Sequence, residues 1–382
     1  MNTAQLTRLL QDLVRLPSVN PRSDPRAPAA TTGEARMADY LADFLHKLGL
    51  DVERHDVEPG RPNVIGKFSS RGGKRSVALA PHTDTVSAAG MTVDPFAAEI
   101  RDGRLYGRGA VDTKASLAAG LAALTRVSRD KSFRAGDLDV WFCALASEEN
   151  GNQGARVLTG RGFKADFAIA GEPTRCRVVH AHKGALWLKI TTRGRTAHRA
   201  TPDLGESAIA KMADVIRYVL GEYAARLKAA PDPVLGPATV NVGVIHGGSG
   251  VNIVPARCEI QLDRRLVGGE TGEAVLAELR RALAAIPVDI ELLGMSCPIL
   301  RTDPAHPFVG ALARATGRPE PLTTMAGFTD AAIFAGHGIP AVVFGPGDMA
   351  QAHAPDEFVE LAQVEEAARI LERFLSAAAR AQ

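Results

Sequence analysis

The sequence lacks the features that mark several large classes of protein. Its 45 basic and 43 acidic residues nearly cancel, which removes the strongly positive surface expected of a protein that binds nucleic acid or anionic membranes. Its longest uncharged apolar stretch, residues 115–125, is well short of the ~18 residues that suggest a membrane span. We therefore expect small-molecule partners, with no nucleic acid and no membrane among them.

The first residues lack the uninterrupted apolar core of a signal peptide. Charged and amide side chains separate the leucines of residues 5–15, a pattern typical of an amphipathic helix. This predicts a cytoplasmic protein.

The sequence also has few cysteines and no nucleotide-binding loop. Its four cysteines form no Cys-x-x-Cys pair, and three of them lie in apolar runs where a buried thiol is ordinary. The glycine-rich segments 247–250 and 345–347 have neither a Lys-Ser/Thr ending nor the G-x-G-x-x-G spacing. A nucleotide-binding enzyme is therefore a poor alternative, and we assign the cysteines no chemistry.

The pattern of expected elements changes twice along the 382 residues, a length that predicts about two domains. Helical and strand patterns alternate in residues 1–179 and again in 295–382, which predicts a mostly parallel sheet with helices on both faces. In residues 180–294 the order is strand, helix, strand, strand, helix, strand, a β-α-β-β-α-β module. We predict an α/β catalytic domain interrupted by a smaller, ferredoxin-like inserted domain.

Side chains that bind metals follow four predicted strands of the first domain. His82 and Asp84 follow residues 77–80; the other three strands lead to side chains at Glu148-Glu149, Glu172 and His353. A fifth motif places Asp112 just before an alanine-rich helix. Because ligands bind at the carboxyl ends of the strands in open α/β sheets, we expect these residues to converge.

Each motif alone has an ordinary structural explanation. A lone histidine at a strand end is more often hydrogen-bonded than metal-bound, and Asp112 is also placed to cap the helix that begins at Thr113. Together, however, two imidazoles and several carboxylates at one sheet edge require cations to offset their desolvation. Mixed nitrogen and oxygen ligands suit zinc, cobalt or manganese.

The adjacent pair Glu148-Glu149 favours catalysis over metal storage. Neighbouring residues of an extended chain point to opposite sides, so the two carboxylates are unsuited to the same ion. One is then free to take a proton from water whose pKa bound metal has lowered. The alternative, two exposed glutamates in a loop, is disfavoured by the apolar strand that precedes them.

The sequence resembles the metallopeptidase family that contains acetylornithine deacetylase, succinyl-diaminopimelate desuccinylase, aminoacylase and carboxypeptidase G. The resemblance extends over almost the whole chain. Its motifs are His82-Thr83-Asp84, Gly107-Arg108-Gly109-Ala110-Val111-Asp112-Thr113-Lys114, Glu148-Glu149, Gly171-Glu172-Pro173, Ala197-His198, Asn252-Ile253-Val254-Pro255 and Ala352-His353-Ala354-Pro355-Asp356-Glu357.

This resemblance implies a centre with two divalent metal ions, zinc first among the candidates. Asp112 would bridge the ions, His82 and Glu172 would complete one site, and Glu149 and His353 the other.

The resemblance also implies roles beside the metals. Glu148 would be the general base and then the acid that protonates the leaving amine. Asp84 would hold the far nitrogen of His82. A cis peptide is expected after Asp112.

For the inserted domain, the resemblance implies a lid that also forms a homodimer. His198 would donate a hydrogen bond to the oxyanion, commonly from the partner subunit, whereas a plain reading makes it a surface histidine in a basic loop. Asn252, Arg265 and Gly327 are the candidate substrate contacts, with Arg265 either a clamp for a carboxylate or a solvated strand residue.

The substrate is predicted from motif details. Residues 345–347 and 352–357 resemble the acetylornithine deacetylase branch, and Gly327-Phe328-Thr329-Asp330 departs from the Ser-Asp-Gly pattern expected of a desuccinylase. We therefore expect a deacetylase of a small N-acyl amino acid, with a role in amino-acid biosynthesis. A desuccinylase, a dipeptidase or a carboxypeptidase are the alternatives. A non-enzymatic binding protein of the same fold is disfavoured, since it would not need Glu148.

Overall fold

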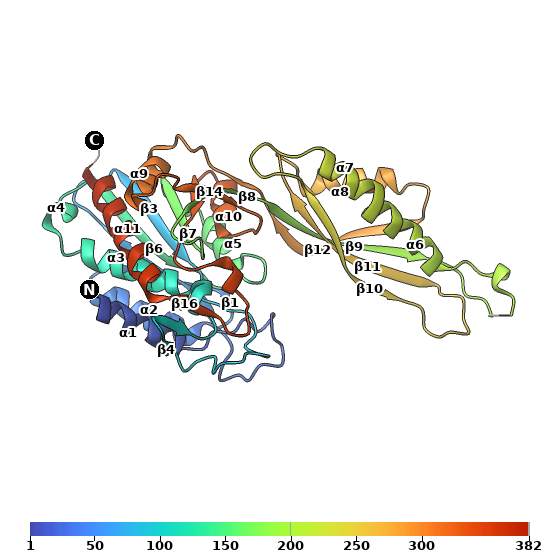
Figure 1. Ribbon diagram of the computed structural model, residues 1–382, viewed down its shortest axis with the longest axis horizontal. Helices are drawn as coiled ribbons and strands as arrows, with labels where there is room; N and C mark the ends of the chain where they lie inside the picture. Colours follow the sequence, from blue (N-terminus) through green and yellow to red (C-terminus); the bar gives the residue numbers. More distant parts are fainter. Residues whose placement is uncertain (199, 381–382) are drawn as a thin grey trace. The chain divides into compact units, whose positions relative to one another are not determined.

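The computed structural model describes residues 1–198 and 200–380, which form two compact units (Figure 1). The first unit consists of Met1–His180, Leu300–Thr324 and Thr329–Gln382. The second consists of Ala181–Ile299 and Met325–Phe328. The chain thus leaves the first unit to form most of the second and then returns.

The first unit is built around a nine-stranded sheet with a parallel centre. Its strands are β1 (Asp51–Glu58), β2 (Arg61–Phe68), β3 (Arg75–Pro81), β6 (Leu138–Ala144), β7 (Phe167–Gly171), β8 (Val178–His182), β13 (Leu300–Arg301), β14 (Leu322–Met325) and β15 (Ala341–Val343). The order is β1-β2-β6-β3-β7-β15-β8-β13, with β14 paired to β8. Strands β6, β3, β7 and β15 are parallel, whereas β1, β2 and β8 pair antiparallel. The predicted sheet is confirmed, although β1, β8, β13 and β14 were not predicted.

Helices cover both faces of this sheet. The helices of the first unit are α1 (Thr3–Val14), α2 (Ala35–Lys47), α3 (Ala115–Val127), α4 (Lys131–Arg134), α5 (Gln153–Gly160), α9 (Pro307–Thr316), α10 (Asp330–Gly336) and α11 (Leu361–Arg380). Helices α1, α2, α3, α9 and α11 share one hydrophobic core with the sheet, while α5 and α10 pack together on the other face. None of the helices within residues 1–198 and 200–380 is long and apolar enough to span a membrane.

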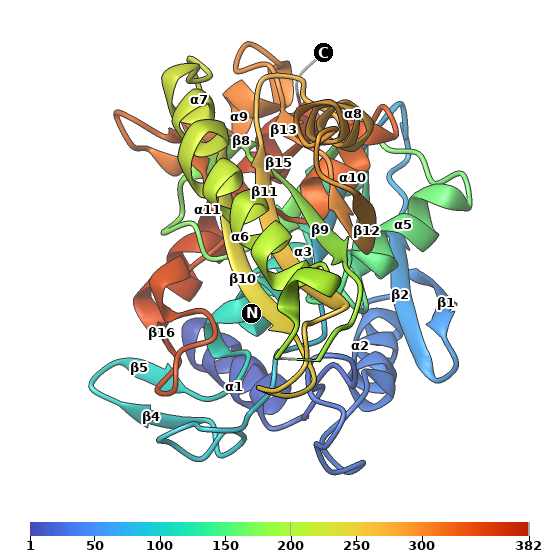
Figure 2. The same cartoon turned by 90° about the vertical axis from the view of Figure 1, so that its right-hand side faces the viewer.

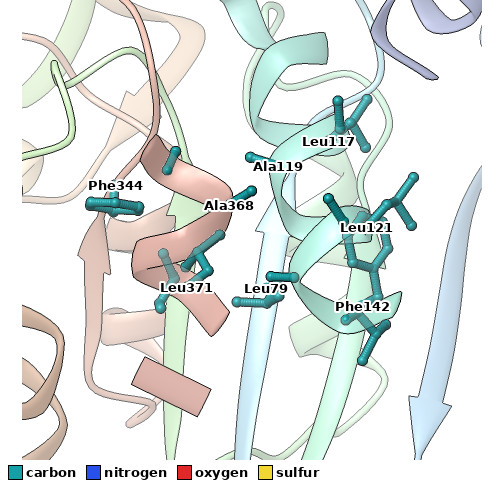
Figure 3. Close-up of a cluster of buried hydrophobic side chains, with 14 of the residues drawn as sticks. Leu79, Leu117, Ala119, Leu121, Phe142, Phe344, Ala368 and Leu371 are labelled. Carbon is teal, nitrogen blue, oxygen red and sulfur yellow. The ribbon is translucent and has the colours of Figure 1, made fainter. Parts of the chain in front are cut away.

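The main core lies between the sheet and helices α3 and α11 (Figure 3). Leu79 of β3 and Phe142 of β6 point toward Leu121 of α3, and Leu371 of α11 lies beside them. Helix α3 packs closely because Gly120 faces the sheet, where a Cβ would lie 3.0 Å from the Phe142 ring. Burial on both faces explains why the central strands are apolar runs without alternation.

The second unit is an antiparallel four-stranded sheet with helices on one side (Figures 1 and 2). Its elements are β9 (Gly184–Arg193), α6 (Ala208–Tyr218), a π-helical turn (Val219–Tyr223), α7 (Ala224–Ala229), β10 (Thr239–Gly247), β11 (Arg257–Leu266), α8 (Gly272–Ala282) and β12 (Val288–Cys297). The sheet order is β10-β11-β9-β12. Along β9, Leu186, Leu188 and Ile190 are buried and Trp187 is exposed, the period of two expected of a sheet covered on one face. The predicted β-α-β-β-α-β order is confirmed.

A small sheet lies beside the loop that carries Asp112. Strands β4 (Glu99–Arg101), β5 (Arg104–Tyr106) and β16 (Phe358–Glu360) form it in the order β16-β5-β4. The backbone of Gly107 donates to the carbonyl of Glu357. This sheet therefore ties the loop of Asp112 to the chain that follows His353.

Candidate metal centre

The carboxyl ends of the parallel strands bring the five predicted ligands together. His82 follows β3, Glu149 lies in the turn after β6, and Glu172 follows β7. His353 lies in the loop after β15, and Asp112 in the segment before α3. Residues far apart in the chain thus meet at one edge of the sheet, as the topology predicts.

Asp112 lies between the two imidazoles. Its Oδ1 is 3.0 Å from Nε2 of His82, and its Oδ2 is 3.2 Å from Nε2 of His353. Oε1 of Glu172 is 3.6 Å from the same nitrogen of His82, and Oε2 of Glu149 is 3.2 Å from that of His353. Each glutamate therefore accompanies a different histidine, and the aspartate is shared.

The centre concentrates negative charge in a buried place. Burial, and after it the charge of Asp112, raises the pKa of Glu149 and of Glu172. The hydrogen bonds that the His353 ring donates to the carboxylates of Asp112 and Glu149 raise the pKa of His353 to about 10. In the described part of the chain, no lysine or arginine forms an ion pair with these carboxylates. The cluster therefore has the electrostatics of a site for cations.

The donor atoms are also close enough to hold metal ions. One ligand atom from each of His82, Asp112 and Glu149 lies within 4.8 Å of the other two, and the same holds for His82, Glu148 and Glu172. This set of nitrogen and oxygen donors fits a divalent cation such as zinc, cobalt or manganese. Because Glu148 belongs to the second group, distance alone does not separate a metal ligand from a base at this position.

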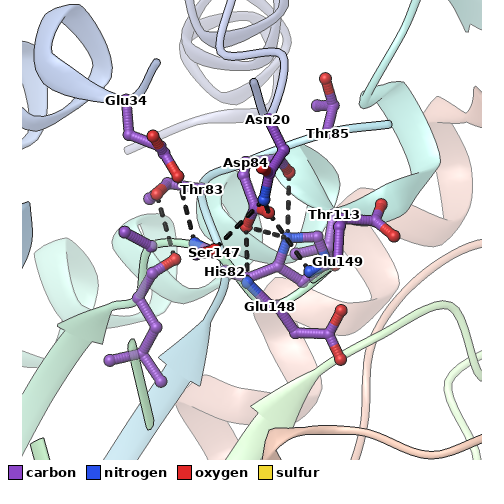
Figure 4. A network of polar contacts seen from close by, with 12 residues as sticks. Asn20, Glu34, His82, Thr83, Asp84, Thr85, Thr113, Ser147, Glu148 and Glu149 are labelled. Carbon is purple, nitrogen blue, oxygen red and sulfur yellow. Dashed lines mark hydrogen bonds and ion pairs between the residues drawn. The ribbon is translucent and has the colours of Figure 1, made fainter. Parts of the chain in front are cut away.

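Asp84 is a buried acceptor for several groups of the centre (Figure 4). Its Oδ1 accepts from the backbone N–H of Glu148 at 2.9 Å, and its Oδ2 accepts from that of Glu149 at 3.2 Å and from Nδ2 of Asn20 at 2.8 Å. Nδ1 of His82 lies 3.0 Å from the backbone oxygen of Asp84 and 3.5 Å from its Oδ1. Asp84 thus lies beside the far nitrogen of His82, where the resemblance placed it, and it also orients the two neighbouring glutamates, which was not predicted.

A buried ion pair supports the same turn from the other side. Nε and Nη2 of Arg61 each donate to the Glu34 carboxylate at 2.7 Å, and Oε1 of Glu34 also accepts from the backbone N–H of Ser147 at 3.1 Å. Both side chains are buried. Neither residue was predicted. Glu34 precedes helix α2 as its N-cap residue, and Arg61 is the first residue of strand β2.

Glu357 holds the loop of Asp112. Its carboxylate accepts from Nη1 of Arg108 at 2.6 Å and from the backbone N–H groups of Val111 and Asp112 at 2.9 and 3.2 Å. Burial raises the pKa of Glu357 to about 7. The Asp112–Thr113 peptide is cis, which confirms the expectation from the resemblance.

Two of the predicted residues of the second unit are neighbours. His198 forms an antiparallel bridge with Ile253, next to Asn252, and both His198 and Asn252 are exposed. Nδ1 of His198 accepts from the backbone N–H of Ala200 at 3.2 Å. The ring therefore carries its proton on Nε2 when neutral.

The other two predicted residues are Arg265, at the opposite end of the second unit's sheet, and Gly327, in the segment 325–328 beside it. Nε of Arg265 donates to Oδ1 of Asp263 at 2.8 Å, and its guanidinium lies 5.3 Å from the centroid of the Phe328 ring. Gly327 precedes this phenylalanine. In the described residues, Nη1 and Nη2 of Arg265 have no hydrogen-bond partner.

Comparisons with known proteins agree with this geometry. Residues 78–377 match the model of peptidase family M20/M25/M40. The chain is 30% identical over 362 residues to an acetylornithine deacetylase of Vibrio campbellii, an alignment that covers 91% of this chain and 92% of that protein. Among solved structures, a tripeptidase of Staphylococcus aureus is similar over 100% of both chains, with a TM-score of 0.80 and 23% identity. A Bacillus subtilis protein described as a dinuclear metal binding peptidase from the M20 family is similar over 99% of this chain and 98% of its own, with a TM-score of 0.72 and 16% identity. This chain therefore belongs to peptidase family M20/M25/M40 and is a hydrolase that acts on amide bonds.

Proposed function

We propose that this hydrolase uses two divalent cations to cleave the amide bond of a small N-acyl amino acid, and that N-acetylornithine is its substrate. The observation that supports two cations is Asp112, whose two oxygens face different histidines, each accompanied by its own glutamate. The identity to an acetylornithine deacetylase supports the substrate.

In this proposal His82, Asp112 and Glu172 hold one cation, and Asp112, Glu149 and His353 hold the other. Zinc is our first candidate, with cobalt and manganese as alternatives. Bound cations would polarise the scissile carbonyl and lower the pKa of water toward ~7.

Glu148 is the proposed general base. Burial, and after it the charge of Glu172, raises the pKa of Glu148, which suits a carboxylate that must hold a proton between two steps. It takes a proton from the attacking water and delivers it to the leaving amine. The hydrogen bond from its backbone to Asp84 fixes its place beside the ligands.

The second unit supplies the remaining proposed groups. Nε2–H of His198 is available to donate to the developing oxyanion. Nη1 and Nη2 of Arg265 would donate to the substrate carboxylate, and Asn252 and Gly327 would be further contacts.

We also propose that the second unit closes over the substrate and forms a homodimer in the cytoplasm. Strand β10 is an edge of its sheet, and the exposed Ile245 lies on it. An exposed edge strand with an apolar side chain is suited to pairing with a second copy.

Metal dependence is the first test. Dialysis against a chelator should abolish activity, and zinc, cobalt or manganese should restore it. Elemental analysis should find two ions in each active subunit. Full activity in metal-free protein would refute the mechanism, whereas one ion in fully active enzyme would refute only the two-metal version.

The second test separates the roles of the two adjacent glutamates. Glu148→Gln should lose several orders of magnitude in kcat and keep its metal, because a base acts on water. Glu149→Gln should lose metal. The reverse result would show that Glu148 is the ligand, as its distance to His82 and Glu172 allows.

The third test addresses the substrate. We would measure kcat/KM for a panel of N-acetyl, N-succinyl and N-formyl amino acids and dipeptides, and expect N-acetylornithine to be best. Faster hydrolysis of a succinyl substrate or a dipeptide would overturn the substrate and leave the metal proposal standing.

The fourth test concerns the dimer. Light scattering should show two subunits. If His198 acts across the interface, mixing inactive His198→Ala and Glu148→Ala subunits should restore activity. No recovery in demonstrated heterodimers would place His198 within its own subunit's site or outside catalysis.

A further inference from the structure

The side-chain amide of Asn152 lies between two buried carboxylates. Its Nδ2 is 3.0 Å from Oε1 of Glu148 and 3.0 Å from Oδ1 of Asp330. The exposed fractions of Asn152, Glu148 and Asp330 are 0%, 7% and 2%. An amide nitrogen carries two hydrogens, so one N–H is available for each carboxylate.

We propose that Asn152 and Asp330 are positioning residues for Glu148. Asp330 accepts one N–H of the amide and thereby orients it, so that the second N–H fixes the Glu148 carboxylate through Oε1. The other oxygen, Oε2, is then the one that exchanges a proton with water. This inference rests on the proposed role of Glu148 as the base.

The surroundings determine the orientation of the amide. With oxygen and nitrogen exchanged, Oδ1 of Asn152 would face two carboxylates and both hydrogen bonds would be lost. In the orientation observed, this Oδ1 is buried and has no hydrogen-bond partner among the described residues, an arrangement that is unfavourable in itself. A side chain that served only for packing would not need this unpaired oxygen. We therefore attribute the role of Asn152 to the two N–H groups of its amide.

A purely conformational role for Asn152 is the main alternative. Its backbone is left-handed, with φ 56° and ψ 36°, just before helix α5, and asparagine tolerates this conformation better than most residues. Glycine adopts the same conformation without strain and has no amide. The variant Asn152→Gly therefore separates the two explanations.

The expected result is a loss of turnover alone. Asn152→Gly should lower kcat about 10- to 100-fold, as the loss of a supporting hydrogen bond typically does, with KM and metal content nearly unchanged. Asn150→Ala is the matched control, because the Asn150 side chain, in the same loop, contacts no described residue by a hydrogen bond. It should leave activity unchanged.

Variants of Asp330 test whether this carboxylate orients the Asn152 amide. Asp330→Asn keeps an oxygen that can accept from Asn152, so it should retain much more activity than Asp330→Ala. This comparison also decides the matter if Asn152→Gly does not fold. Equal losses in folded Asp330→Asn and Asp330→Ala enzymes would overturn the role of the hydrogen bond.

A double-mutant cycle shows whether Asn152 acts through Glu148. In a Glu148→Ala background, Asn152→Gly should cause no further loss of the residual activity. Full kcat in Asn152→Gly alone, or the same loss in both backgrounds, would overturn this inference. Full activity in Glu148→Ala alone would instead refute the proposed base, so the two failures are distinguishable.

Discussion

Replacing Asp84 should damage stability and metal binding together. The side chain is 1% exposed and accepts from the backbone N–H groups of Glu148 and Glu149 and from Nδ2 of Asn20. Asp84→Ala leaves the two backbone N–H groups without an acceptor, and also one N–H of the Asn20 amide, whose Nδ2 keeps only its 3.2 Å contact with Oγ of Ser147. It also removes the carboxylate that lies 3.5 Å from Nδ1 of His82.

The magnitude follows from these contacts. A buried donor without an acceptor costs about 1–3 kcal/mol, so three of them set an upper limit of about 9 kcal/mol. Water that enters the vacated space offsets part of this, and we expect the free energy of unfolding to fall by about 3 kcal/mol. Asp84→Asn keeps one oxygen, which can still serve Glu149 and Asn20, and leaves Glu148 unpaired. Its loss should be about 1–3 kcal/mol.

Two measurements check this prediction. Urea unfolding of metal-free protein gives the stability, and competition with a chelator gives the metal affinity, which should fall about 10- to 100-fold because His82 and Glu149 both lose support. Both the free energy of unfolding and the metal affinity should be highest in the wild type, lower in Asp84→Asn and lowest in Asp84→Ala. An Asp84→Ala protein with wild-type stability and metal affinity would refute the role assigned to this carboxylate.

Three further predictions concern other groups of the fold. Arg61→Met should lower the free energy of unfolding by about 3–5 kcal/mol, since Glu34 is then buried without its partner, and urea unfolding should show partial recovery when Glu34→Gln is added. Burial lowers the pKa of His182 to about 4 from 6.5; the unfolded chain therefore binds this proton first as the pH falls, and stability is lost below about pH 6.5. Compared with His182→Gln, the wild type should lose about 2 kcal/mol more between pH 7 and pH 5, and parallel denaturation curves would contradict this. Zinc should raise the melting temperature of the metal-free protein, because each bound ion adds about 2.7 kcal/mol to the free energy of unfolding at 100 times its Kd. An unchanged thermal transition would contradict the cation site.

The sequence predicted those parts of the fold that have a local signature. Strands β3 and β7 are short apolar runs because both of their faces are buried. The second unit was predictable because buried and exposed side chains alternate along β9 and β11. Four of the five proposed metal ligands were predicted because each follows such a strand, and Asp112 was predicted from its motif before an alanine-rich helix.

The parts that were missed depend on contacts between distant residues. Strand β1 is charged and largely exposed, and only its pairing with β2 makes it a strand. Asn20 contacts Asp84 across 64 residues, and Asn152 contacts Asp330 across 178. For Asp330 the sequence indicated only its place in the motif Gly327-Phe328-Thr329-Asp330, which distinguishes this chain from a desuccinylase. No pattern in one sequence shows which polar side chain will meet which carboxylate.

The position of β15 has a consequence for biosynthesis. This strand lies between β7 and β8, although the ribosome makes it only after the whole second unit. A nascent chain therefore carries a gap in the middle of its sheet, with unpaired edges on β7 and β8 that can pair wrongly. His353 and Glu357 arrive later still. The proposed set of metal ligands is therefore complete only after the whole second unit has been made, and a chain that stops before His353 lacks one of them.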